Sequence, residues 1–100
     1  MVTYVMSATI AHSVRCNREA REAMADRISR SVTQRLQDEG WKDHEVQVVL
    51  SRSRTSIGCQ GLTRTDGLPY DLKVSAAIYR LTHALLCQEI REERHARRRP

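Results

Sequence analysis

The sequence predicts an α+β fold, a two-layer sandwich in which a mixed sheet of three or four strands packs against two helices on one face. Three observations predict it, and the first is that the apolar spacing alternates along the chain between two residues and about 3.6. The second is length, because 100 residues have room for one modest core, placed here in residues 1–93 with a basic tail at 94–100. The third is composition: 40% hydrophobic and 29% charged residues are typical of a folded globular chain, and 4% aromatic residues predict an aliphatic core. The expected order is β-α-β-β-(β)-α.

The first strand and the first helix follow from a change of period near residue 17. Every second residue from Val2 to Ile10 is apolar, which predicts a half-buried strand. The next apolar residues fall on one side of a helix that Asn17 can cap and Gly40 can end. That stripe comprises Ala20, Met24, Ala25, Ile28, Val32 and Leu36.

Two more strands are expected before the last helix. Val46, Val48 and Leu50 predict a strand parallel to the first one, because a helix separates the two in the chain. Residues 56–65 predict a third strand, expected to pair with the second as a hairpin. The Asp66-Gly67 pair favours a further turn, which leaves open a fourth strand at 68–72, confined to an edge by its proline.

The last helix is expected from Asp71 or Ser75 onward and has two apolar sides. The first side holds Val74, Ala77, Ile78, Leu81, Ala84 and Leu85. The second holds Tyr79, His83, Leu86 and Ile90, spaced four, three and four residues apart. Such a second side is either covered by the same chain or offered to a partner. We expect a protein interface here, most simply that of a homodimer.

The charge balance predicts an anionic partner. Seventeen basic residues, of which 15 are arginines, face 12 acidic ones, for a net charge of +5. We expect a nucleic-acid-binding surface if the turn after the second strand and the end of the last helix lie on one side. Because aromatic residues are so few, phosphate contacts are more plausible than base stacking. The alternative is an ordinary solvated surface with acids interleaved. The candidate residues are Arg52, Arg54, Arg64, Arg94, Arg97, Arg98 and Arg99.

The sequence predicts neither catalysis nor a cofactor. Cys16, Cys59 and Cys87 are odd in number and lack metal-ligand spacing, which favours a reduced, cytoplasmic setting without a metal. Gly58-Cys59-Gln60-Gly61 has the outline of a phosphate loop but lies in a strand-like stretch, where a bulge is the simpler interpretation. His83 and Cys87 are one helical turn apart without a third group to orient them. The N-terminal stretch alternates instead of running apolar, so we expect neither a signal peptide nor a membrane span.

Two families share this order of elements. The segment Asp26–Leu36, followed by Val46–Leu50 and Thr55–Gly58, resembles the helix, strand and hairpin of DinI-like modulators of recombination filaments, which are often carried by phages. With the Asp66-Gly67 hairpin, the chain also resembles the β-α-β-β-β-α domain of ribosome hibernation factors, whose basic helices face ribosomal RNA. Both resemblances imply a non-enzymatic protein that docks on a nucleoprotein machine.

The sequence therefore predicts a small basic accessory protein that binds RNA, DNA or a nucleoprotein complex through arginines. The competing hypothesis is an inhibitor or adaptor, encoded by a phage or plasmid, that binds a host or defence protein through the last helix. Salt discriminates between them, since phosphate binding weakens as ionic strength rises.

Overall fold

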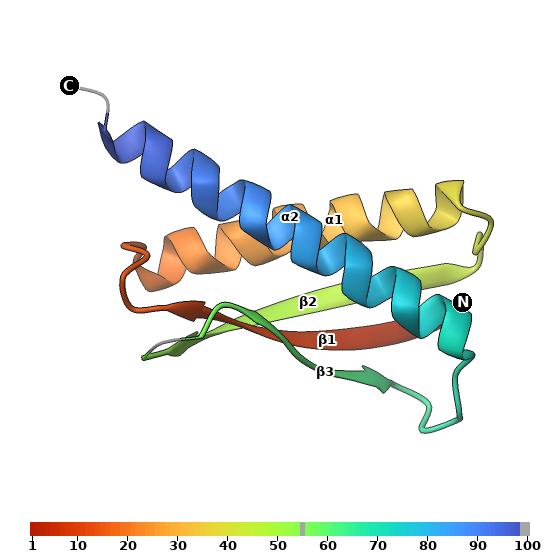
Figure 1. The fold of residues 1–100 in the computed structure, drawn as a ribbon. Helices are drawn as coiled ribbons and strands as arrows, with labels where there is room; N and C mark the ends of the chain where they lie inside the picture. The colour runs from red at the N-terminus through yellow and green to blue at the C-terminus, as the bar shows by residue number, and fades with distance from the viewer. Residues whose placement is uncertain (55, 99–100) are drawn as a thin grey trace.

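Two helices cover one face of a three-stranded sheet in the computed structural model, which describes residues 1–54 and 56–98 (Figure 1). This confirms the predicted α+β sandwich. The expected basic tail is not a separate segment where the chain is described, because the last helix continues through Arg98. The elements are β1 (Val2–Ala11), α1 (Arg18–Asp38), β2 (His44–Ser53), β3 (Gly58–Arg64) and α2 (Leu72–Arg98).

β1 is the central strand, with the order β2-β1-β3 across the sheet. β1 and β2 are parallel and in register from Val2 opposite His44 to Ala11 opposite Ser53, as predicted. The expected hairpin between the second and third strands is wrong, because β3 pairs antiparallel with β1. Because β1 lies at the centre of the sheet, its inward side chains are the most completely buried of the three strands. These are Tyr4, Met6, Ala8 and Ile10, each at most 1% exposed.

The outer edge of β2 is closed by side chains of α1, which is the physical reason that β3 does not pair there. The Val46 N–H donates to Thr33 Oγ1 at 3.0 Å, and the same hydroxyl donates to the Val46 carbonyl at 3.1 Å. The Val48 N–H donates to Ser29 Oγ at 2.8 Å. Gln37 Nε2 donates to the His44 carbonyl at 3.2 Å. We call Ser29, Thr33 and Gln37, spaced four residues apart on α1, the edge ladder.

The Asp66-Gly67 turn forms but does not return as a strand. The Gly67 N–H donates to the Arg64 carbonyl at 3.0 Å, and Gly67 has a φ of 73°, which favours glycine. The chain then enters α2, where Asp71 Oδ1 accepts from the Lys73 N–H at 2.7 Å. Between the turn and α2, the Tyr70 hydroxyl donates to the Leu62 carbonyl at 3.2 Å. This hydrogen bond occupies the outer edge of β3, where a fourth strand would have to pair. The possible strand at 68–72 is therefore absent.

The core is aliphatic, as the composition predicts. Tyr4 is the one aromatic residue among the buried side chains of the described chain, and it stacks on His44 and meets Tyr70 edge-on. α1 contributes five buried residues of its predicted stripe. These are Met24, Ala25, Ile28, Val32 and Leu36.

The edge ladder predicts the effect of Thr33→Val. This change keeps the volume but removes both hydrogen bonds to Val46, so it should lower the free energy of unfolding by about 1–2 kcal/mol in a urea titration. Thr33→Ser keeps the hydroxyl and serves as the control. A loss in Thr33→Ser without a loss in Thr33→Val would show that the methyl group, and not the hydrogen bonds, matters.

His44 predicts a loss of stability on mild acidification. Burial, and then the nearby Arg64 charge, hold the pKa of His44 below its ordinary value of 6.5. The unfolded chain therefore binds a proton first as pH falls, and stability should decline from about pH 6.5 toward the folded-state pKa. His44→Phe keeps a ring against Tyr4 and should reduce the difference in unfolding free energy between about pH 7.5 and 5.5. An unchanged difference would exclude His44 as its source.

Candidate nucleic-acid interface

Three segments distant in sequence lie at the same end of the molecule. They are residues 12–22, which join β1 to α1 and form the first turns of that helix, residues 51–54 at the end of β2, and residues 91–98 of α2 (Figure 1). We call them together the basic end. They hold nine arginines against four acidic residues, whereas the rest of the chain has eight basic and eight acidic residues. The net positive charge is therefore concentrated at this end. Its exposed or half-exposed arginines, apart from Arg52, are Arg15, Arg18, Arg21, Arg54, Arg91 and Arg94.

Arg52 belongs to the basic end but is turned toward the protein. Its Nη2 donates to the Val14 carbonyl at 3.4 Å and also to the Cys16 carbonyl. Its Nη1 lies 3.5 Å from His12 Nδ1. Even-numbered residues of β2 face the helices, so the guanidinium reaches the chain that leads into α1. Arg52 thus positions the segment that carries Arg15 and Arg18.

Arg64 is not part of the basic end. It lies at the end of β3, where the sheet meets the N-terminus of α2 (Figure 1). Its Nε is 2.8 Å from Asp66 Oδ1, and its Nη1 donates to the Pro69 carbonyl at 3.2 Å. The side chain is 20% exposed, and its charge is already paired. The sequence grouped Arg64 with the other arginines, and this prediction is wrong. Because β3 runs antiparallel to β1, it ends at the opposite end of the sheet from the basic end.

The remaining predicted arginines divide into those that the structure describes fully and those that it does not. Arg54 and Arg94 are exposed at the basic end. Arg97 and Arg98 lie in the last turn of α2. Arg99 lies outside the described residues.

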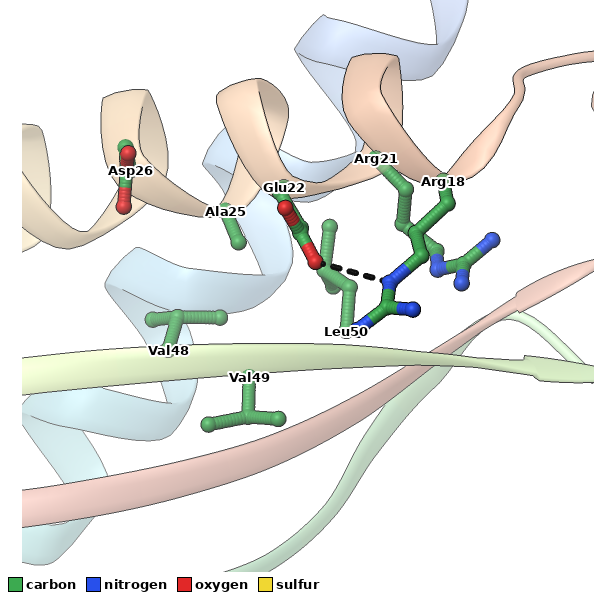
Figure 2. A pocket seen from close by; sticks show the side chains of 8 residues that line it. All are labelled: Arg18, Arg21, Glu22, Ala25, Asp26, Val48, Val49 and Leu50. Atoms are coloured by element: carbon green, nitrogen blue, oxygen red, sulfur yellow. Dashed lines mark hydrogen bonds and ion pairs between the residues drawn. The ribbon is translucent and has the colours of Figure 1, made fainter.

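An open groove separates the first turns of α1 from β2 at this end (Figure 2). Its volume is about 650 Å³, and Arg18 and Arg21 project beside each other at its mouth. Arg18 Nε is 3.1 Å from Glu22 Oε1, but both side chains are so exposed that the pair contributes little stability. The groove lies where the edge ladder stops: one turn before Ser29 stands Ala25, whose methyl group has no polar atom to bond the edge of β2 at Val48–Leu50. Sequence analysis missed Arg18 and Arg21, which carry no motif.

The interface expected on α2 is mostly closed by the chain itself. Leu86 and Ile90 are 1% and 4% exposed and belong to the core, so they cannot contact a partner. Tyr79 is half-buried, and His83 is exposed. The prediction that Leu86 and Ile90 face a partner is wrong because α2 packs against both α1 and β3, which cover these two side chains. Leu86 and Ile90 therefore belong to the buried face of α2.

Elsewhere in the described residues, the histidine, cysteine and acidic side chains give little support for metal binding or nucleophilic catalysis. No group of three or more of these side chains in the described chain could hold a metal ion. Burial, and secondarily the neighbouring Cys87, raises the pKa of the Cys59 thiol, which disfavours the nucleophilic thiolate. His83 lies 3.8 Å from Cys87 Sγ through Nδ1, without a carboxylate to orient the pair. None of the helices in residues 1–54 and 56–98 is both long and apolar enough to cross a membrane.

Comparison with protein-family models, with curated proteins and with solved structures finds no match. The interpretation of this end therefore rests on its own geometry and charge.

Arg52 in β2 and Arg54 just after it predict a contrast in stability. Arg52→Ala leaves the Val14 and Cys16 carbonyls without their donor and should lower the free energy of unfolding by about 1–3 kcal/mol. Arg54→Ala removes the same charge from an exposed position and should change it by less than about 0.5 kcal/mol. Urea titration of both variants measures the contrast. Equal effects would refute the positioning role of Arg52.

Proposed function

We propose that this protein binds nucleic acid, free or within a nucleoprotein complex, through phosphate contacts from the basic end. The observation that carries the proposal is the concentration of the net charge there, on three segments that only the fold brings together. Arginine presents a planar fork of donors that matches phosphate oxygens. A cluster of such groups displaces counterions from a phosphate backbone, and that displacement supplies most of the affinity in non-specific binding.

The absence of aromatic side chains at this end argues for reading the backbone and not unstacked bases. Tyr4 is buried, Trp41 follows α1 at the opposite end, and Tyr70 lies between β3 and α2. Tyr79 is half-buried in the third turn of α2. Proteins that bind single strands without sequence preference use exposed rings on which bases stack. A duplex, whose phosphates lie on a regular surface, therefore fits this end better than a single strand.

The C-terminal turns of α2 give the basic end a shape suited to a duplex. Among the residues of α2 up to Ala96, Ile90 is the last buried one, and the residues from Arg91 to Ala96 are exposed except for Glu93. A helix that extends beyond its own core, about 10–12 Å wide with its side chains, matches the width of a major groove. Arg91 and Arg94 stand one turn apart on this extension. The helix can thus add contacts to those made by the α1 end.

Paired charge removals test the proposal. Arg54→Ala with Arg94→Ala should weaken binding to a fluorescein-labelled 20-base-pair DNA duplex. Each lost phosphate contact should lower the slope of log affinity against log salt by about 0.9. Lys42→Ala with Lys73→Ala removes two exposed charges from the opposite end and is the matched control. Fluorescence anisotropy between about 50 and 200 mM salt measures both.

Two outcomes contradict the proposal. No binding of duplex or single-stranded DNA or RNA at about 50 mM salt would exclude the function, because the electrostatic contribution is largest there. Equal losses in the two double variants would show that net charge, and not the basic end, governs binding. The competing hypothesis of a protein target contacted through α2 is less favoured, since Leu86 and Ile90 are buried.

A further inference from the structure

A bulge in β3 turns the thiol of Cys59 toward the helices. Cys59 stands opposite Ala8 of β1. Leu62 stands opposite Met6, so two residues of β3 face the single residue between Met6 and Ala8. Met6 and Ala8 are buried beneath the helices, and side chains opposite each other on neighbouring strands share a face of the sheet. The Cys59 side chain is therefore half-buried against the core, on the face that the helices cover.

The packing of the helices brings Cys87 of α2 to the same level. The row of the sheet that contains Cys59 crosses β1 and reaches Leu50 of β2, which lines the groove at the first turns of α1 (Figure 2). Arg27, in the next turn of α1, pairs with Glu89 of α2 at 2.8 Å. Since α2 also packs against β3, it passes Cys59 within a turn of Glu89. Cys87 is half-buried there and, after burial, is the second cause of the raised pKa of the Cys59 thiol.

The two thiols differ in their surroundings. The exposed His83, one turn before Cys87, has its ring nitrogens 3.8 and 3.9 Å from the Cys87 sulfur, so the neutral ring can accept the thiol proton. Burial, and then the neighbouring Cys87, disfavours the thiolate of Cys59. Because thiol–disulfide exchange starts from a thiolate, Cys87 is the sulfur that reacts first with an external disulfide. Cys59 is the sulfur that reacts second, within the chain.

We propose that Cys59 and Cys87 are a thiol pair that closes to a disulfide when it meets an oxidised low-molecular-weight thiol of the glutathione class. The Cys87 thiolate attacks one sulfur of the small disulfide, forms a mixed disulfide and releases one small thiolate. The Cys59 thiolate then attacks the Cys87 sulfur and releases the second small thiolate. The protein thiols lose two electrons and two protons, and the small disulfide takes them up as two thiols. The bond joins β3 to α2 and does not depend on nucleic-acid binding.

Reaction of the full chain with oxidised glutathione tests the pair. Intact-mass spectrometry should find a monomer lighter by two hydrogen atoms, and tryptic mapping should join Cys59 to Cys87. The midpoint of thermal unfolding should rise by about 10 °C, because a bond that closes the loop of residues 59–87 restricts the unfolded chain. Dithiothreitol should reverse both changes.

Serine variants separate the two steps. Cys59→Ser should stop at the mixed disulfide, with one glutathionyl group on Cys87, whereas Cys87→Ser should form no internal bond. Cys16→Ser is the matched control and should still close the bond, since Cys16 is buried before α1. Circular dichroism verifies that each variant folds.

The wild-type chain alone can overturn the proposal. A chain that forms no bond between Cys59 and Cys87 overturns it, whether the chain stays reduced, keeps glutathione or joins either thiol to Cys16. A bonded chain that unfolds at the same or a lower temperature also overturns it, because the native fold would then not hold the two thiols together. Loss of the bond in Cys16→Ser would likewise contradict the assignment.

Discussion

The rest of the fold depends on the hydrogen bonds that α1 makes to the outer edge of β2. Ser29, Thr33 and Gln37 satisfy backbone groups of β2 that a neighbouring strand would otherwise pair with. With that edge occupied, β3 can add to the sheet only on the other side of β1, and β1 becomes the buried centre. α1 then lies over β2, and α2 is left to cover β3 and to pack against α1. One helix face of hydroxyl and amide groups thus determines the strand order, the helix positions and the exposed side of α2.

The same edge ladder explains why the basic end is open. It ends at Ser29, and the part of the β2 edge beyond it, at Val48–Leu50, forms the floor of the groove beside Arg18 and Arg21 (Figure 2). Arg52 holds the preceding segment through carbonyl contacts, so one arginine of this end stabilises the structure that presents the others. Two ion pairs, Arg27 with Glu89 at 2.8 Å and Arg80 with Glu39 at 2.6 Å, also link α2 to α1 and its C-cap, while α2 carries its C-terminal turns to the same end. The basic end is therefore a product of packing.

Local patterns predicted the elements well because each has a local cause. Asn17 Oδ1 accepts from the Ala20 N–H at 2.7 Å, as an N-cap does, and Gly40 has the positive φ of 113° that ends α1. Strand order had no local cause, since an alternating strand pairs equally well with either neighbour. Sequence spacing also misplaced Leu86 and Ile90, because it measures the width of an apolar face but not how many neighbours cover it. The arginine surface was predicted only in part for the same reason.

The sequence by itself determined the α+β class, the bounds of the helices within a few residues, the parallel pairing of β1 and β2 and the excess of positive charge. These follow from periodicity, from capping residues and from the crossover that a helix between two strands requires. Only the tertiary structure decided which arginines share an end, which ones pair within the protein and which side of α2 stays uncovered. Each of these depends on contacts between residues far apart in the chain, such as Arg52 with Cys16 and Thr33 with Val46, which no local pattern encodes.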